Sequence, residues 1–207
     1  MASEIQISPR FLFDTKERNI IDSATGERRE LEELSTKIDV FEDRVLGWFF
    51  EIANGLRQND DASYVLLMIA TAQVEGLQQY YEGGSSDRKS RKFFRRGIWR
   101  IFGSDVATET AIDKFYSAVR CGLFHDGFTN GDVFLSETFS DPLQFDGSEQ
   151  IIKINPQLFV SSVEKDIKNY CAKLRTNNEP DLVKHFEHIW ELRWRAGKAA
   201  LNKGYLP

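Results

Sequence analysis

The sequence predicts a mainly α-helical protein: a bundle of about five to six helices with a short β-hairpin inserted near residues 127–154. Three observations predict this class. From residue 31 onward, apolar residues recur at spacings of three and four, which is typical of helices that bury one face. Turn-forming Gly, Asn, Asp and Pro gather between residues 127 and 156. Finally, 207 residues with 41% hydrophobic content suffice for one well-buried core.

The first 30 residues are expected to form a poorly defined and loosely attached arm. Ile5–Ile7 and Phe11–Phe13 are candidates for short strands, and residues 23–26 (Ser-Ala-Thr-Gly) are a candidate turn. The helical domain is expected to cover residues 31–207.

Two long helices are predicted between residues 31 and 81. A single apolar stripe runs along the first, formed by Leu31, Leu34, Ile38, Phe41, Val45, Trp48, Ile52 and Leu56. The second runs from Tyr64 to about Tyr81, with Asp61 or Ser63 as its cap. Residues 65–70 are apolar all round, which predicts that the second helix is the buried centre of the bundle.

Four further helices follow. They are expected at residues 88–100, from Thr108 or Thr110 to 125, from Asn155-Pro156 to about 175, and at 180–201 as an extra C-terminal helix. Asn-Pro is a typical start, because Asn caps the helix and Pro suits its first position. Between the fourth and fifth helices, apolar pieces at 133–135 and 151–154 predict the hairpin insertion.

Composition limits the classes of protein. Two cysteines, Cys121 and Cys171, cannot build a disulfide framework or a zinc site, so free thiols and no metal or other cofactor are expected. The start of the chain lacks the pattern of a signal peptide. The longest apolar run, around residues 64–72, is about half of a membrane span. We therefore expect a cytoplasmic protein without membrane contact. His185 and His188 are expected to be surface residues.

The segment from Arg120 to His125 is the only credible chemical centre in the sequence. Histidine can donate or accept a proton near neutral pH. One arginine guanidinium can bind two phosphate oxygens at once through two parallel hydrogen bonds. Spacing alone argues against joint action, because residues five apart in an ideal helix are rotated by ~140° and separated by ~7.5 Å along the axis. The two side chains share a face only if the helix ends or loosens near Gly122.

The residues around this pair resemble the HEPN superfamily, whose mark is an Arg-x4–6-His motif near the end of a bundle helix. The resemblance lies in Tyr116, Arg120, Leu123-Phe-His125-Asp-Gly and the later Ile154-Asn-Pro156, and it covers residues 31 to about 175. It implies a homodimer that cleaves RNA without a metal, with Arg120 and His125 as the matching catalytic pair. Other members are inactive binding modules.

Four residues near the pair are expected to support it. Cys121 stands where the family usually has a polar residue, a departure that puts catalysis in doubt. Glu75, within an apolar helix, either pairs with Arg120 or takes a solvated or capping role elsewhere. Asp126 either contacts waters at a phosphate site or starts the turn at Gly127, and Tyr116 is expected in the core.

A basic segment is the candidate RNA surface. Residues 88–100 contain no acid and leave a net charge of −12 on the rest of the chain, since the whole chain carries −5 and the segment +7. Its cations are Arg88, Lys89, Arg91, Lys92, Arg95, Arg96 and Arg100. They are expected to bind phosphates. The interleaved Phe93, Phe94 and Trp99 either stack on bases or, as we favour, face the core.

Three functional hypotheses follow. The first is a dimeric HEPN endoribonuclease in toxin–antitoxin or phage-defence biology, with RNA, a second copy and an antitoxin or other protein as partners. The alternative is a non-catalytic HEPN module that binds RNA, a nucleotide or a partner protein. The third is a helical adaptor outside this family.

Overall fold

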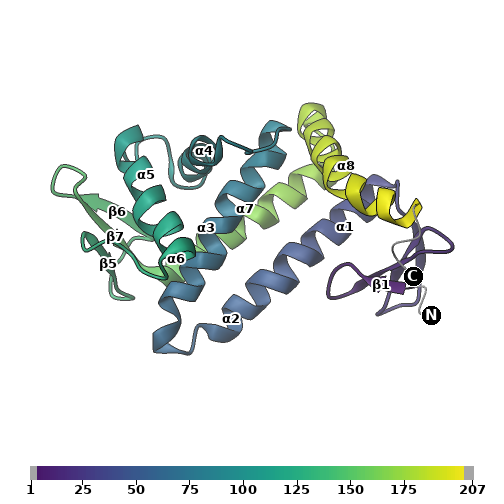
Figure 1. The fold of residues 1–207 in the computed structure, drawn as a ribbon, viewed down its shortest axis with the longest axis horizontal. Helices are drawn as coiled ribbons and strands as arrows, with labels where there is room; N and C mark the ends of the chain where they lie inside the picture. Colours follow the sequence, from purple (N-terminus) through teal and green to yellow (C-terminus); the bar gives the residue numbers. More distant parts are fainter. Residues whose placement is uncertain (1–3, 203–207) are drawn as a thin grey trace. The chain divides into compact units, whose positions relative to one another are not determined.

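The computed structural model describes residues 4–202, with the backbone alone at residues 60 and 196–202. The described part is mainly helical and includes two small sheets (Figure 1). It forms two compact units. Of the described residues, unit 1 comprises 4–51, 80–84 and 168–202, and unit 2 comprises Ile52–Gln79 and Ser85–Ile167. The sequence instead predicts an N-terminal arm and one helical domain. The spacing of apolar residues shows that a long helix has a buried face, but it does not show which of two cores each part of that helix packs against.

The N-terminal segment is a sheet of unit 1 and not a loose arm. Its strands pair antiparallel in sequence order: β1 (Glu4–Gln6), β2 (Phe11–Asp14), β3 (Asn19–Asp22) and β4 (Arg28–Glu30). Phe11 and Ile20 are buried. The backbone N–H of Arg10 donates to Asp43 Oδ2 at 2.8 Å, so the sheet is tied to the first helix.

The first helix contains a widened turn. It runs as α1 (Leu34–Val45), the π-helical turn η1 (Leu46–Glu51) and α2 (Ile52–Leu56). The predicted stripe holds as far as Val45, after which Phe50 and Ala53 are buried and Ile52 is 56% exposed. A π-helical turn contains an extra residue, so the buried face moves by one position and the second half of the predicted stripe is wrong.

Unit 1 has an aromatic core. Phe41 of α1 contacts the rings of Tyr80, Tyr170 and Phe186 at centroid distances of 4.7, 6.2 and 5.6 Å. Tyr80 belongs to the end of α3 (Ser63–Glu82), Tyr170 to α7 (Pro156–Thr176) and Phe186 to α8 (Pro180–Asn202). Burial raises the pKa of Tyr80 to about 12. His185 is also structural, since its Nδ1 lies 2.8 Å from the Tyr81 carbonyl oxygen.

Unit 2 is built around α3, α4 (Ser90–Phe102), the helical segment of residues 109–125 and the first part of α7. The apolar residues of these helices are largely buried, but α3 is not buried all round as the sequence predicts, since Val65 is 45% exposed. Representative core residues are Leu66, Leu67, Val74, Phe94, Ile98, Ile112, Phe115, Val119, Leu123, Phe159 and Val163. The start of α7 follows the prediction, because Asn155 Oδ1 accepts a hydrogen bond from the Leu158 backbone N–H at 3.1 Å.

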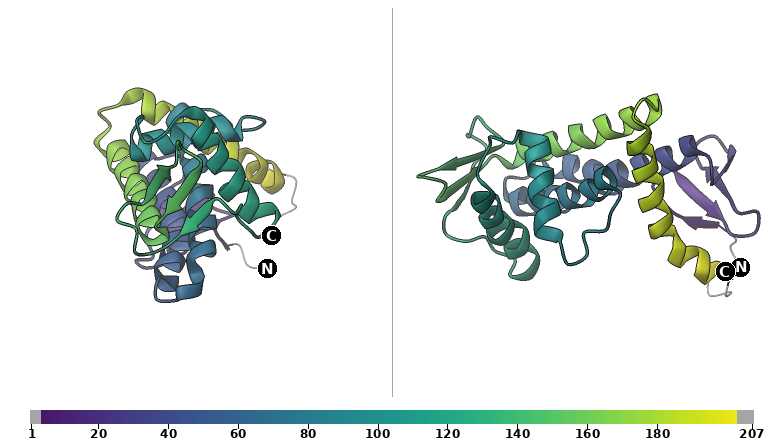
Figure 2. Two further views of the ribbon diagram at one scale, coloured as in Figure 1. Left: turned by 90° about the vertical axis from the view of Figure 1, so that its left-hand side faces the viewer. Right: turned by 90° about the horizontal axis from the view of Figure 1, so that it is seen from above.

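The insertion in unit 2 is a three-stranded sheet, where the sequence predicts a hairpin. β6 (Leu143–Asp146) and β7 (Ile151–Ile154) form the antiparallel hairpin, and β5 (Val133–Leu135) adds to β7 in parallel. The sheet lies beside α5 (Figures 1 and 2). The sequence does not predict the parallel pairing of β5 with β7, because turn residues indicate pairing only between strands that follow each other in the chain. Within the described residues, no helix is long and apolar enough to cross a membrane.

Candidate active site

The predicted pair belongs to a helical segment whose turns are uneven. Thr108 caps α5 (Glu109–Phe115), with its hydroxyl accepting from the Ala111 N–H at 3.3 Å. The π-helical turn η3 (Tyr116–Cys121) follows, then α6 (Gly122–His125). The N–H of Gly122 reaches back five residues to the Ser117 carbonyl. Because Arg120 lies inside this wider turn, the rotation computed for an ideal α-helix does not describe its position relative to His125.

Arg120 is held from the side of α3. Its Nη2 donates to Glu75 Oε2 at 3.2 Å, and the Ser86 hydroxyl donates to the other Glu75 oxygen at 2.7 Å. The Arg120 guanidinium also lies 4.9 Å from the centre of the Phe124 ring. The Arg120 side chain is 24% exposed and that of Glu75 is 10% exposed. Of the two roles open to Glu75, the structure shows the pairing with Arg120.

Tyr116 lies between two guanidinium groups. The Arg91 and Arg120 guanidinium carbons are 5.6 and 5.7 Å from its ring centre, and Arg91 also donates to the Ser117 hydroxyl at 3.2 Å. Tyr116 is buried, as expected. Burial first, and then the neighbouring Cys121 thiol, raise the pKa of Tyr116. The phenol therefore stays protonated near neutral pH, which makes it a positioning group and a poor base.

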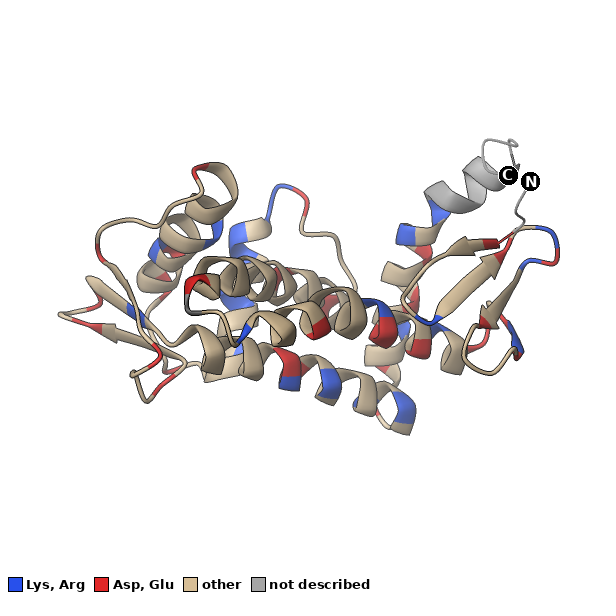
Figure 3. Ribbon diagram, turned by 90° about the horizontal axis from the view of Figure 1, so that it is seen from below, with Lys and Arg blue, Asp and Glu red and all other residues tan. Residues whose placement is uncertain are grey.

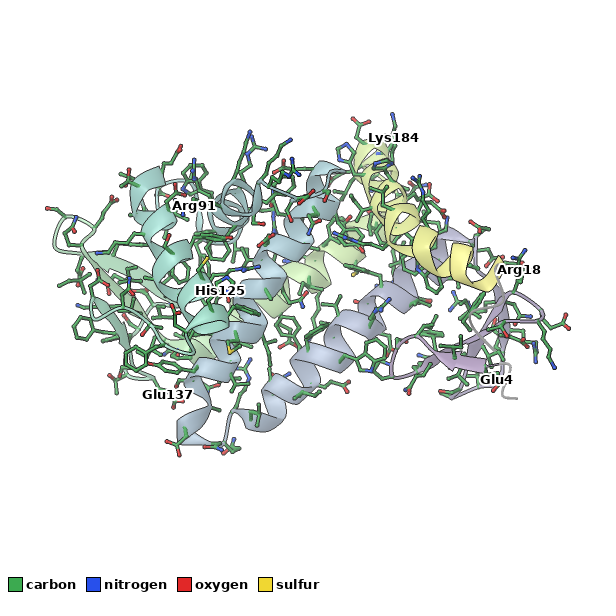
Figure 4. The ribbon with its side chains drawn as sticks, viewed as in Figure 1. Glu4, Arg18, Arg91, His125, Glu137 and Lys184 are labelled. Carbon is green, nitrogen blue, oxygen red and sulfur yellow. The ribbon has the colours of Figure 1, made fainter. Side chains whose placement is uncertain are left out.

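His125 ends the segment on the surface (Figure 4). No side-chain hydrogen bond or ion pair from the described residues occupies its imidazole, so it is open to a ligand. The chain turns at once: the Asp126 and Phe128 N–H groups both return to the Gly122 carbonyl, at 2.8 and 3.3 Å. Gly127 has a φ of +66°. This geometry suits the turn-forming role of Asp126.

Gly122 allows this turn to approach the helix. A Cβ at Gly122 would lie 2.4 Å from the Phe128 carbonyl oxygen, closer than real contacts allow. The turn also carries Phe124 and Phe128, which are 43% and 67% exposed. His125 is thus flanked in sequence by two exposed phenylalanines.

The cations of the basic segment differ in their surroundings; Figure 3 colours the Lys and Arg positions blue along the ribbon. Arg95 binds Asp113 through two hydrogen bonds of 3.0 and 2.9 Å and also pairs with Glu109. Arg100 binds Gln78 at 2.8 Å and pairs with Asp166. The remaining cations, Arg88, Lys89, Arg91, Lys92 and Arg96, are exposed.

The aromatic residues of this segment mostly belong to the core. Phe93 and Phe94 are buried, and Phe94 contacts Phe115 at a centroid distance of 5.4 Å. Trp99 is half-buried. Base stacking by Phe93 and Phe94 is therefore excluded, while Trp99 keeps an accessible part.

The two thiols differ in their surroundings. Cys121 is half-buried and Cys171 is buried, and burial raises the pKa of the Cys171 thiol. The described side chains contain no group of three or more His, Cys, Asp or Glu arranged to hold a metal ion.

Comparison with protein-family models, with curated proteins and with solved structures finds no match for this chain.

Proposed function

We propose that this chain is a HEPN-type endoribonuclease that cleaves RNA without a metal ion. The observation that supports it is the arrangement of one helical segment: Arg120 is anchored through Glu75 and Ser86 while partly exposed, and His125 is exposed on the following turn. An anchored cation and an exposed imidazole on one helical segment are two groups that phosphoryl transfer from RNA can use. The resemblance of the Arg120–His125 motif to the HEPN superfamily supplies the reaction class.

The proposed reaction is attack of a ribose 2′-OH on the adjacent phosphate. The new 2′-O–P bond forms as the bond to the 5′-oxygen of the next nucleotide breaks, which leaves a 2′,3′-cyclic phosphate and a 5′-hydroxyl. Arg120 binds non-bridging phosphate oxygens and stabilises the charge that develops on them. His125 takes the 2′-OH proton or gives one to the leaving oxygen. A homodimer supplies a second His125, so that base and acid can act in one turnover.

Anchoring by Glu75 serves this role in a specific way. Arginine has many rotamers, and fixing it before substrate binds lowers the entropic cost of placing it on the phosphate. In the cell, the proposal includes a cytoplasmic toxin or phage-defence role and an antitoxin or other protein partner.

The test is the chemistry of cleavage. Single-stranded RNA is incubated with the protein in excess EDTA, and the product ends are identified. The expected result is cleavage with 2′,3′-cyclic phosphate ends, and none at a position where one 2′-deoxynucleotide replaces the ribonucleotide. Cleavage that stops in EDTA, or products with 5′-phosphate ends, would refute the proposal.

One observation favours a second candidate, an RNA-binding module without catalysis. Cys121 follows Arg120 and lies half-buried next to Tyr116, where the HEPN resemblance leads us to expect a polar residue. The same incubation separates the candidates: a binding module retains RNA in a mobility-shift assay and leaves it intact at every enzyme concentration.

A further inference from the structure

A surface pocket of about 440 Å³ lies on α4 and the start of α5, within unit 2. Lys92, Arg95, Arg96, Trp99 and Glu109 line it. Its volume is in the range of pockets that bind small ligands. Arg120 and His125 do not line it, so it is a separate feature of the same unit.

The pocket has a fixed aromatic wall. The Trp99 indole N–H donates to the Ala107 carbonyl oxygen at 3.2 Å, which sets the orientation of the ring. Arg95 lies 6.0 Å from the Trp99 ring centre, and its charge is balanced by Asp113 and Glu109. The half-buried indole is therefore held by its neighbours and offers a flat apolar surface next to a neutralised guanidinium.

The pocket also has a cationic rim along one face of α4. Lys92 and Arg96 are exposed and lie one helical turn apart, and Trp99 lies three residues further. Residues at spacings of three and four share a helix face. The distance from Lys92 to Trp99 along the axis is about 10 Å at 1.5 Å per residue, comparable to roughly three stacked nucleotides of a strand at ~3.4 Å each.

The mixed charge of the lining narrows the ligand class. A purely anionic ligand, such as an acidic peptide, gains from Lys92 and Arg96 but is repelled by Glu109, whose side chain is 63% exposed. A nucleotide matches both the cationic rim and the aromatic wall, because its phosphate pairs with Lys92 and Arg96 and its base stacks on Trp99. A carboxylate such as that of Glu109 can accept a hydrogen bond from a base amino group.

The lining also has a link toward the candidate active site. Arg91 lies one helical turn before Arg95 of the pocket and contacts the Tyr116 ring, which Arg120 also contacts. We propose that this pocket binds an unpaired nucleotide of single-stranded RNA, with its base on Trp99 and the flanking phosphates on Lys92 and Arg96. This inference rests on the proposed function for its choice of RNA, and it adds the substrate form, since a base in a duplex is not free to stack on Trp99.

The experiment measures binding without cleavage. A fluorescein-labelled 12-nucleotide single-stranded RNA is titrated with the His125→Ala protein, and anisotropy is followed over a series of salt concentrations. Two variants remove different parts of the pocket: Lys92→Gln/Arg96→Gln removes both cations, and Trp99→Leu removes the aromatic surface but keeps an apolar side chain. Lys165→Gln/Lys184→Gln is the matched control, because it removes the same charge from exposed positions of α7 and α8.

The two variants should fail in different ways. The loss of two phosphate contacts should weaken binding and reduce the slope of log K against log salt by about 1.4, at ~0.7 per phosphate on a single strand. Trp99→Leu should weaken binding by roughly five- to hundredfold with the slope unchanged, as expected for the loss of one stacked base. Trp99→Phe should restore most of the affinity, which would separate lost stacking from misfolding.

Several outcomes would overturn the inference. The first is that both pocket variants bind the single-stranded RNA as tightly as the control variant does. The second is that a duplex of the same sequence binds as tightly as the single strand. The third is that poly-glutamate displaces the labelled RNA as well as unlabelled single-stranded RNA does. Because the assay needs no cleavage, it can succeed when the nuclease proposal fails. Conversely, the Lys92→Gln/Arg96→Gln and Trp99→Leu proteins could fold, cleave RNA and bind it with unchanged affinity. That result would refute the role of the pocket in RNA binding and leave the nuclease proposal standing.

Discussion

Gly122 offers a sharp test of the geometry around the candidate site. Its backbone has φ −56° and ψ −48°, which any residue adopts, and alanine in a helix is normally favoured over glycine by ~1 kcal/mol. Here the added Cβ would lie 2.4 Å from the Phe128 carbonyl oxygen. We therefore expect Gly122→Ala to lower stability, against the usual trend for helices.

The size of the effect follows from the contacts. To admit the Cβ, the turn must move by close to 1 Å, an overpacking cost of about 1–3 kcal/mol. The 3.3 Å hydrogen bond from the Phe128 N–H to the Gly122 carbonyl would be lost, at a net cost of about 1 kcal/mol. After the helix-propensity gain of ~1 kcal/mol, the net destabilisation should be about 1–3 kcal/mol. His125 directly precedes the displaced turn, so RNA cleavage should fall by about tenfold or more.

Urea denaturation with a matched variant measures this. Gly76 lies within α3, and its nearest neighbour to an added Cβ is Gln73 Oε1 at 3.8 Å, an ordinary contact. Gly76→Ala should therefore raise the free energy of unfolding by about 0.5–1 kcal/mol. A Gly122→Ala protein as stable and as active as wild type would refute the close approach of helix and turn.

Three further predictions follow from single contacts. Glu75→Gln keeps an acceptor but removes the charge facing Arg120, so we expect a roughly tenfold lower kcat with little change in KM, measured by steady-state RNA cleavage; an unchanged kcat would remove Glu75 from the site. Phe94→Ala should lower the free energy of unfolding by about 3–5 kcal/mol, because the ring is buried; a loss below 1 kcal/mol in urea would contradict that. Arg10 lowers the pKa of Asp22 to about 2, so ionised Asp22 stabilises the fold above its ordinary pKa near 4, and wild type should lose more stability than Arg10→Ala as the pH falls from 4 to 2. Equal losses in acid denaturation would show that the pair contributes nothing.

The sequence predicts helices well where one face packs regularly. The buried faces of α5 and α7 and the Asn155 cap follow from residue spacing and local hydrogen bonding alone. The prediction fails at the widened turn η1, where Phe50 is the next large apolar side chain after Val45 on the buried face. A step of five residues contradicts the α-helical period, and no single residue type signals it.

The same limit applies at the candidate site. The sequence identifies Arg120 and His125 but opposes their joint action, because the argument assumes an ideal helix. The structure has a π-helical turn at Tyr116–Cys121, which removes that objection without placing the two side chains in contact. Ser86, the second partner of Glu75, could not be predicted, since it comes from a loop brought close by the packing of α4.

Tertiary pairing decides the roles of the basic segment. Seven cations in 13 residues predict a phosphate surface, yet Arg95 and Arg100 are bound by Asp113 and Asp166. These acids lie 18 and 66 residues away in the chain, beyond the reach of a local pattern. The surface that remains is narrower than the sequence indicates.

The most direct test of the central proposal is the rate of RNA cleavage in EDTA by wild type, Arg120→Ala, His125→Ala and the control His188→Ala, an exposed histidine of α8. We predict cleavage by wild type and His188→Ala at equal rates, and losses of about 10²–10⁴-fold in the other two variants. Equal cleavage by all four proteins, with folding unchanged, would contradict the assignment of catalysis to Arg120 and His125.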